Sequence, residues 1–426
     1  MHAHTVGVTP DNTVISPLYD DPVAVLGNDV VDRRHLLRVG AWGIAAALIG
    51  GCCTADTPHR ESRDISPADK LAVLTQIVQH RTQAYARGDL TGWLTGVTEA
   101  QRPDAQHAFQ VMRAAGVIDL NLGTPQLRGQ SYDSSCTYRF AGFDSGLGHA
   151  EVQWQLVEDP RIGSWVEIHE PAALPWEEPG AQARRSSTTL VVGSAPAGDL
   201  DTLLHDGDQA AAAVARVWGG SAVCPVIWLP RTTRSFARWA GVPHGGGVPA
   251  VTVGPILHGR STGADRIVID PAVWARLVPE GRRIILTHEA THLAVRRDCL
   301  GSRPLWLDEG FSEYVAYHDR AIPEPQIVAA LTAQVRSGGV PAEFPASSDF
   351  DGPGRAAAYA AGLLACRVLA ESVGEDALTR LIRSDLGVDG RSGAFADAVQ
   401  RATGWSVTAW TRQWQGRVRA VCSWGR

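Results

Sequence analysis

Two histidines four residues apart, inside a segment rich in apolar residues, constrain the fold of this chain most strongly. The sequence His288-Glu289-Ala290-Thr291-His292 lies within residues 279–297, whose apolar residues are compatible with a helix buried on much of its circumference. In a helix, residues four apart project from the same face, so both imidazoles can converge on one ion. Glu289 lies beside them, angled to reach a metal-bound water rather than the metal. The segment is therefore predicted to be a buried helix that carries a metal site.

A second motif downstream offers a third ligand. Residues 306–314, with the sequence WLDEGFSEY, could begin a second helix that carries Glu309 near its start. Asp308 fits the first turn of such a helix, where a carboxylate complements the macrodipole. A catalytic zinc ion takes three protein ligands and keeps one position open for water, and His288, His292 and Glu309 supply the three. We therefore expect one Zn²⁺ per chain as the cofactor.

Together the two motifs resemble those of the gluzincin metallopeptidases, the group that includes thermolysin and the aminopeptidase-type enzymes. The similarity is specific over residues 288–317, where an element W-L-x-E-G-F-x-x-Y follows the zinc helix. By this resemblance Glu309 is the third ligand and Glu289 is the general base. Glu313, one turn beyond Glu309, would hold a ligand imidazole from behind, and Asp308 is a second candidate for that role. The resemblance implies a zinc peptidase that hydrolyses peptide bonds with a metal-activated water.

The resemblance also implies a hydrogen-bond donor for the reaction oxyanion, which family members supply as Tyr or His from a later helix. Tyr359, within the Ala-rich residues 355–362, is the candidate, and a core aromatic on that helix is the alternative. The small residues around Tyr359 are expected to pack closely on the zinc helix. Residues 266–270 are expected to form an edge strand beside the cleft, where an extended substrate would pair. The G-x-M-E-N element of aminopeptidases is missing, so exopeptidase activity is not implied.

A second function from a different class stays open. It is a catalytically inactive, zinc-containing binding module for peptides or envelope components. The intact Glu289 favours the enzyme, whose partner would be a peptide or protein substrate. The net charge of −6, from 39 basic and 45 acidic residues, gives no reason to expect nucleic acid as a partner. We expect a monomer.

The N-terminal residues have the pattern of an export signal. Arg33 and Arg34 precede an uncharged apolar stretch, residues 39–51, which is shorter than the roughly 20 residues of a membrane-spanning helix. The junction Ile49-Gly50-Gly51-Cys52 resembles a bacterial lipobox, in which the cysteine is acylated. The sequence thus predicts an exported cell-envelope protein, anchored through a lipid on Cys52 to the outer face of the cytoplasmic membrane. A simple signal anchor and a buried apolar segment are the alternatives.

The predicted organisation is an α+β chain. The ranges are a leader with the signal segment at 1–53, a tether at 54–65, a small cone-like α+β domain at 66–175, a linker at 176–187 and the zinc peptidase domain at 188–426. The last range is expected to hold a mixed sheet followed by a mainly helical subdomain. The C-terminal segment from residue 406 is expected to be an amphipathic helix, with Trp410 and Trp414 packed on the zinc domain. The cysteines beyond Cys53 form one or two disulfides or are small buried apolar residues.

Overall fold

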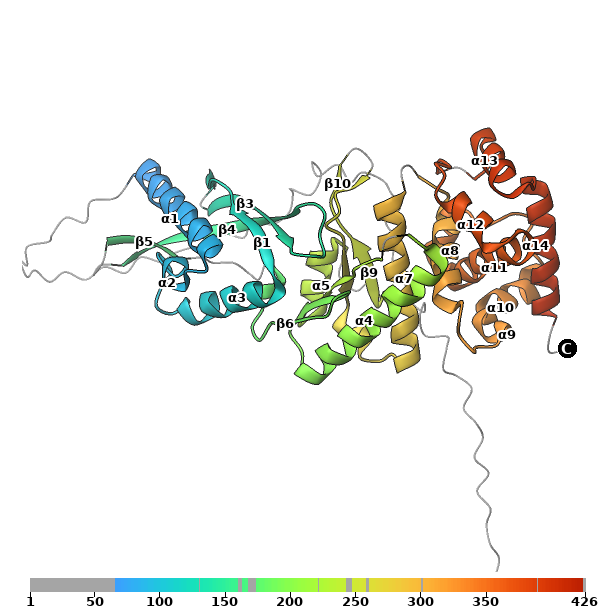
Figure 1. Ribbon diagram of the computed structural model, residues 1–426, viewed down its shortest axis with the longest axis horizontal. Helices are drawn as coiled ribbons and strands as arrows, with labels where there is room; N and C mark the ends of the chain where they lie inside the picture. The colour runs from blue at the N-terminus through green and yellow to red at the C-terminus, as the bar shows by residue number, and fades with distance from the viewer. Residues whose placement is uncertain are drawn as a thin grey trace, which may run out of the picture.

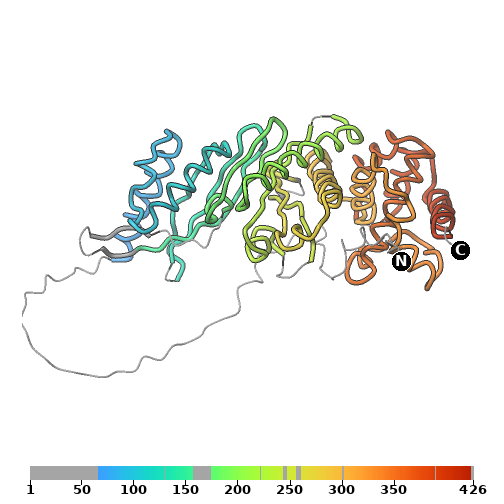
Figure 2. Tube along the Cα trace, turned by 90° about the horizontal axis from the view of Figure 1, so that it is seen from below, coloured from blue at the N-terminus to red at the C-terminus, as the bar shows by residue number. Residues whose placement is uncertain are grey.

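The computed structural model describes residues 66–129, 131–159, 163–167, 174–220, 222–242, 247–257, 260–299, 302–388 and 390–423. The predicted leader, with Cys52, and the predicted tether lie outside the described residues. Figure 1 shows three parts that follow one another along the long axis: an N-terminal unit of helices and strands, a central sheet, and a helical part. Figure 2 shows the same order from below. The mixture of helices and separate sheets confirms the α+β class in its coarse form.

The N-terminal unit places three helices against an antiparallel sheet. The first helix begins where the Ser66 hydroxyl accepts a hydrogen bond from the Asp69 amide, and it ends at Gly88, which has a φ of 70°. The sheet has the strand order β1-β3-β4-β5, and β2 also pairs with β3. The elements are α1 (Pro67–Arg87), α2 (Leu90–Trp93), α3 (Arg102–Ala115), β1 (Val117–Leu122), β2 (Gln126–Arg128), β3 (Ser131–Phe140), β4 (Gly148–Asp159) and β5 (Gly163–Glu167).

The central sheet is mixed and has the strand order β6-β7-β8-β12-β9. Its parallel middle strands are β7 (Leu190–Gly193), β8 (Val226–Leu229) and β12 (Arg266–Ile269), with antiparallel β6 (Gln182–Arg185) and β9 (Ala250–Val253) at the edges. The prediction that residues 266–270 form the edge strand is therefore wrong. That strand lies inside the sheet, and β9 is the edge on that side.

Short elements surround this sheet. The range 176–187, expected to be a linker, contains part of the 3-10 helix η3 (Pro175–Glu177) and all of β6, so the central sheet begins at Gln182. A small hairpin of β10 (Ile256–Leu257) and β11 (Arg260–Ser261) follows β9. The helices α4 (Ala197–Trp218) and α5 (Thr233–Ala240) connect strands of the sheet, and the short helix α6 (Pro271–Trp274) follows β12.

Both faces of the central sheet are buried, because successive side chains of each strand point to opposite sides. Val191, Ile227 and Ile267 belong to the apolar core shared with the helical part. Their neighbours Val192, Trp228 and Val268 belong instead to the core of the N-terminal unit, together with residues of α1, α3, β3 and β4. The sheet therefore lies between two apolar cores and contributes side chains to both.

A buried ion pair also joins the N-terminal unit to this sheet. Arg266 of β12 donates to both carboxylate oxygens of Asp144, at 2.6 and 2.7 Å, and the side chains are only 3% and 2% exposed. Beside it, the main-chain amides of Ser145 and Gly146 donate to the carbonyl oxygen of Gly263. The contact between the two parts thus combines apolar packing with a buried ion pair.

The helical part forms around two long helices that cross closely. Gly310 of α8 and Gly362 of α11 meet at the crossing, where a Cβ atom on Gly310 would lie 2.5 Å from the main chain of Gly362. The small residues near Tyr359 were expected to pack on the zinc helix, and this prediction is wrong about the partner, which is α8. The elements are α7 (Pro279–Asp298), α8 (Leu305–Tyr317), α9 (Glu324–Ile327), α10 (Ala329–Gly338), η4 (Ser347–Phe350), α11 (Arg355–Val373), α12 (Glu375–Ile382), α13 (Gly393–Thr403) and α14 (Val407–Cys422).

The C-terminal helix α14 packs on α11, as the spacing of its apolar residues predicts. The indole nitrogens of Trp410 and Trp414 donate to the carbonyl oxygens of Ala365 and Ala361, and both rings are fully buried. By length and composition α11 could cross a membrane, but it is largely buried inside the protein. In the part of the chain that the structure describes, the cysteines at 136, 224, 299, 366 and 422 form no disulfide with one another, and all but Cys224 are buried.

Candidate metal centre

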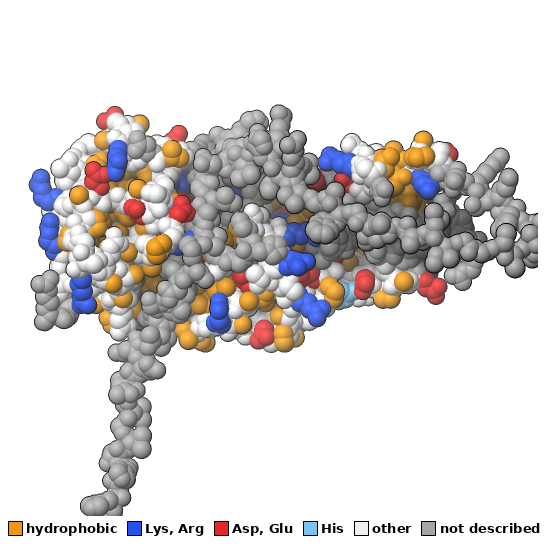
Figure 3. Space-filling view, turned by 180° about the vertical axis from the view of Figure 1, so that it is seen from behind, with side chains coloured by type: hydrophobic (Ala, Val, Ile, Leu, Met, Phe, Trp, Pro, Cys, Tyr) orange, Lys and Arg blue, Asp and Glu red, His pale blue; other side chains and the backbone are white. Residues whose placement is uncertain are grey.

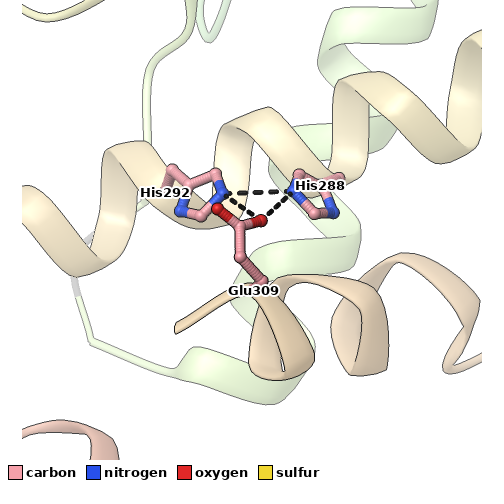
Figure 4. Close-up of side chains that lie close together, drawn as sticks. All are labelled: His288, His292 and Glu309. Atoms are coloured by element: carbon pink, nitrogen blue, oxygen red, sulfur yellow. Dashed lines mark hydrogen bonds and ion pairs between the residues drawn. The ribbon is translucent and has the colours of Figure 1, made fainter. Parts of the chain in front are cut away.

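The candidate metal centre lies where α7 passes α8. The predicted helix at 279–297 is α7, whose residues from Ile284 to Val295 are almost all buried between the central sheet and the helical part. His288 and His292 project from adjacent turns of α7, and Glu309 reaches them from α8 (Figure 4). The structure thus brings together the three residues that the sequence proposed as ligands.

The three donor atoms converge on one point. The Nε2 atoms of His288 and His292 lie 3.1 Å apart, and the Oε2 atom of Glu309 lies 3.1 Å from the first and 3.4 Å from the second. The site is nearly closed, since His288 is 7% exposed and Glu309 is 5% exposed. A group of this composition and spacing could hold a metal ion.

Carboxylates of α8 stand behind both histidines. The Oε1 atom of Glu313 lies 3.0 Å from Nδ1 of His288, and the Oδ2 atom of Asp308 lies 3.5 Å from Nδ1 of His292. Asp308 is in the first turn of α8, as the sequence predicted. The helix therefore places one carboxylate at the shared point and one beside each imidazole, as is usual where histidines hold a metal.

This arrangement could hold a cation at its centre. If both imidazoles are neutral and carry their hydrogens on Nδ1, beside the carboxylates, the lone pairs of Nε2 face the shared point. In that state two nitrogen lone pairs and an oxygen of Glu309 lie within 3.4 Å of one another. Such a contact is repulsive unless a positive charge lies between the atoms.

The pKa values of His288, His292 and Glu309 are shifted by one another's charges. Burial alone would lower the pKa of His288, but Glu309 and Glu313 raise it to about 9. Burial acts on His292 in the same direction, yet Glu309 and Asp308 raise its pKa well above the ordinary value. Burial would raise the pKa of Glu309, and the two histidines lower it to about 2. A bound cation would replace the protons that these groups otherwise share.

Glu289 lies beside the ligands and is held by a residue that the sequence analysis missed. The carboxylate is 8% exposed, and its pKa is raised by burial, against the two positively charged histidines. The hydroxyl of Thr252 on β9 lies 2.7 Å from Oε2 of Glu289. No local pattern could have revealed this contact, because Thr252 precedes Glu289 by 37 residues and reaches it only through the pairing of the sheet.

Tyr359 lies close to the candidate ligands. Its ring centroid is 6.0 Å from that of His288, and the residue is 7% exposed. Burial and the carboxylates of Glu309, Glu313 and Glu289 raise the pKa of Tyr359 well above its ordinary value. The phenol therefore keeps its proton and can act as a hydrogen-bond donor.

A buried arginine, also missed by the sequence analysis, extends the network. Nη1 of Arg303 donates to Oδ1 of Asp308 at 3.0 Å, and Arg303 is 7% exposed. Burial would raise the pKa of Asp308, but His292 and Arg303 hold it well below the usual range. Arg303 thus contributes a positive charge to a centre in which carboxylates predominate.

Comparison with known proteins adds no relative. No family model matches the chain, and no curated protein matches its sequence. The resemblance to the gluzincins therefore rests on residues 288–317 and stays a prediction.

Proposed function

We propose that this protein is a zinc-dependent peptidase. The observation that carries the proposal is the convergence of His288, His292 and Glu309 on one point, with the Glu289 carboxylate beside it. Two imidazoles and one carboxylate are a ligand set of catalytic zinc sites, which keep a fourth position open. A structural zinc site would use four protein ligands, so the set of three favours catalysis.

The spacing of the donor atoms supports zinc as the ion. Zinc bonds to nitrogen and oxygen measure about 2.0 to 2.2 Å, so neighbouring donors of a tetrahedral site lie about 3.3 to 3.6 Å apart. The measured separations are 3.1, 3.1 and 3.4 Å. A small contraction of this kind is expected when hydrogen bonds join the three groups. Zinc would need only slight movement of the side chains.

Glu289 is proposed as the general base and Tyr359 as the donor to the oxyanion. Zinc, when bound, would supply Lewis acidity and lower the pKa of a coordinated water toward about 7. Glu289 would take a proton on the carboxylate oxygen that Thr252 does not hold, and later pass it to the leaving amine. The protonated phenol of Tyr359 would donate to the carbonyl oxygen of the substrate as negative charge develops there.

The substrate class we propose is an extended peptide or protein segment. Edge strand β9 is only half-buried over most of its length and carries Thr252, which touches Glu289. An extended chain could add to this edge by main-chain hydrogen bonds and pass beside the ligands. Anchoring through Cys52 and location at the outer face of the cytoplasmic membrane stay predictions from the sequence.

The first experiment is the metal content of the purified full-length chain, by elemental analysis, together with cleavage of a mixed peptide library. We expect about one zinc per chain, lost in His292→Ala and kept in His205→Ala, a control at an exposed histidine of α4. We expect cleavage that Glu289→Gln abolishes, because this change removes the base and leaves all three ligands.

The outcomes separate the two candidate functions. A chain without zinc would refute the metal site. Zinc without cleavage would contradict the peptidase and favour the binding module for peptides or envelope components. Cleavage that survives in Glu289→Gln would contradict the role of Glu289 as the base.

A further inference from the structure

We infer that Thr252 is a positioning residue that sets the orientation of the Glu289 carboxylate. This inference rests on the proposed function, in which Glu289 is the base. The hydroxyl of Thr252 lies 2.7 Å from Oε2 of Glu289 and 3.0 Å from the main-chain oxygen of the same residue. Among the described residues, no other side chain donates a hydrogen bond to this carboxylate.

The fold of the sheet determines where Thr252 points. In β9, Ala250 belongs to the core on the helical side, and Val251 and Val253 pack against the core of the N-terminal unit. Thr252 pairs with Ile267, which also faces the helices. The alternation of the strand therefore turns the Thr252 hydroxyl toward α7. Its branched side chain also suits a strand.

The geometry distinguishes the two carboxylate oxygens of Glu289 by their contact with Thr252. A hydroxyl has one hydrogen, and an ionised carboxylate is a stronger acceptor than a main-chain carbonyl, so Thr252 donates to Oε2. That bond fixes the rotation of the carboxylate and leaves Oε1 as the oxygen without this donor. The bond is short, at 2.7 Å, and Glu289 is only 8% exposed. Few other orientations of its carboxylate therefore fit.

A hydroxyl is well suited to hold a base. A neutral hydroxyl can orient the carboxylate through a hydrogen bond without placing a second full charge beside it. The main-chain oxygen of Glu289, at 3.0 Å, gives the hydroxyl a second acceptor, so its hydrogen is never left without one.

The test compares Thr252→Val, which keeps the shape and removes the hydroxyl, with Thr252→Ser, which restores it. We expect Thr252→Val to lower kcat about 10-fold, as the loss of one orienting hydrogen bond to a charged group does. KM and zinc content should stay near wild type, and Thr252→Ser should recover most of kcat. Thr233→Val is the matched control, since it removes a 2.8 Å hydroxyl–carboxylate bond to Asp270 instead.

A second readout does not depend on activity. Crystal structures of the full-length variants prepared without zinc should show the Glu289 carboxylate rotated away in Thr252→Val and in its original place in Thr252→Ser. An unmoved carboxylate in Thr252→Val would overturn the inference, as would unchanged kcat in a wild type that cleaves peptides. Loss of zinc in Thr252→Val would overturn it too, since Thr252 would then act on the ligands. A wild type that binds zinc and cleaves nothing would refute the proposed function, while the crystal structures would still decide whether Thr252 orients Glu289.

Discussion

Three carboxylates of α8 take different positions in the candidate metal centre. Glu309 faces the shared point, while Asp308 and Glu313 face the far sides of the two imidazoles. Their positions follow from the helix, because residues 308, 309 and 313 lie on one side of it. Each carboxylate thus acts on a different atom, and the three should not substitute for one another.

Glu313→Gln should weaken zinc binding without abolishing it. The amide keeps the size of the side chain but loses the charge that makes His288 a better ligand, and such partners contribute about 10- to 100-fold to metal affinity. The measurement is a competition titration with a chelator. Glu280→Gln is the control, since Glu280 pairs with Arg283 and Arg320 at the surface. Equal zinc affinity in the Glu313 and Glu280 variants would contradict this role.

The ligand residues could be predicted from sequence because their geometry is local. A spacing of four on a helix brings His288 and His292 together whatever the rest of the chain does. Glu309 could be predicted from the motif at residues 306–314. It reaches the histidines because α8 crosses α7. Thr252 and Arg303 act through contacts between elements, and neither residue type nor spacing marks them in the sequence.

At the scale of elements, the candidate metal centre depends on the distance between α8 and α11. The two helices touch at Gly310 and Gly362, immediately beside the ligand Glu309. Larger side chains would separate the helices and displace the first turns of α8. The glycine pair therefore influences the site without contacting it.

Gly362→Ala should destabilise the protein and weaken zinc binding. A Cβ atom at this position would lie 2.6 Å from the carbonyl oxygen of Trp306, so the main chain of α8 must move, at a cost of about 1 to 3 kcal/mol. Unfolding in urea and a zinc titration measure the two effects. Gly416→Ala in α14 is the control, because a Cβ there meets open space and the helix gains from alanine. Similar stabilities of the two variants would refute the prediction.

The order of the strands could not be predicted in the same way. Residues 266–269 have the apolar character of a strand, which the sequence revealed, but whether a strand lies inside a sheet depends on partners far away in the chain. Here β12 pairs with β8 and β9, so it lies inside the sheet, and β9 takes the edge. All four residues of β12 are buried, which is the property of an inner strand.

At the scale of the whole molecule, the N-terminal unit is part of the same folded body as the metal centre. It covers one face of the central sheet, while α7 covers the other. On the face drawn in Figure 3, acidic and basic side chains are interspersed over the described residues of both parts. The central sheet joins the two parts because its side chains belong to the cores on both of its faces.

Asp144→Asn should destabilise the entire protein. The change leaves the Arg266 guanidinium buried without its counter-charge, which typically costs about 3 to 5 kcal/mol. Denaturant unfolding followed by tryptophan fluorescence measures the loss, and Trp228 and Trp154 lie in the affected core. Asp201→Asn, which breaks the more exposed pair with Arg184, should cost less than about 1 kcal/mol. A loss in Asp144→Asn no greater than in that control would show that the buried pair adds nothing.

Because the central sheet contributes side chains to two cores, it affects when the N-terminal unit can fold during synthesis. Synthesis proceeds from the N-terminus, and domains tend to fold as they emerge from the ribosome. The core of the N-terminal unit, however, includes Val192, Trp228 and Val268. A nascent chain that has not yet reached Val268 has all the helices and strands of that unit but lacks the side chains that close it. Folding of the first unit must therefore wait for residues about a hundred positions further along the chain.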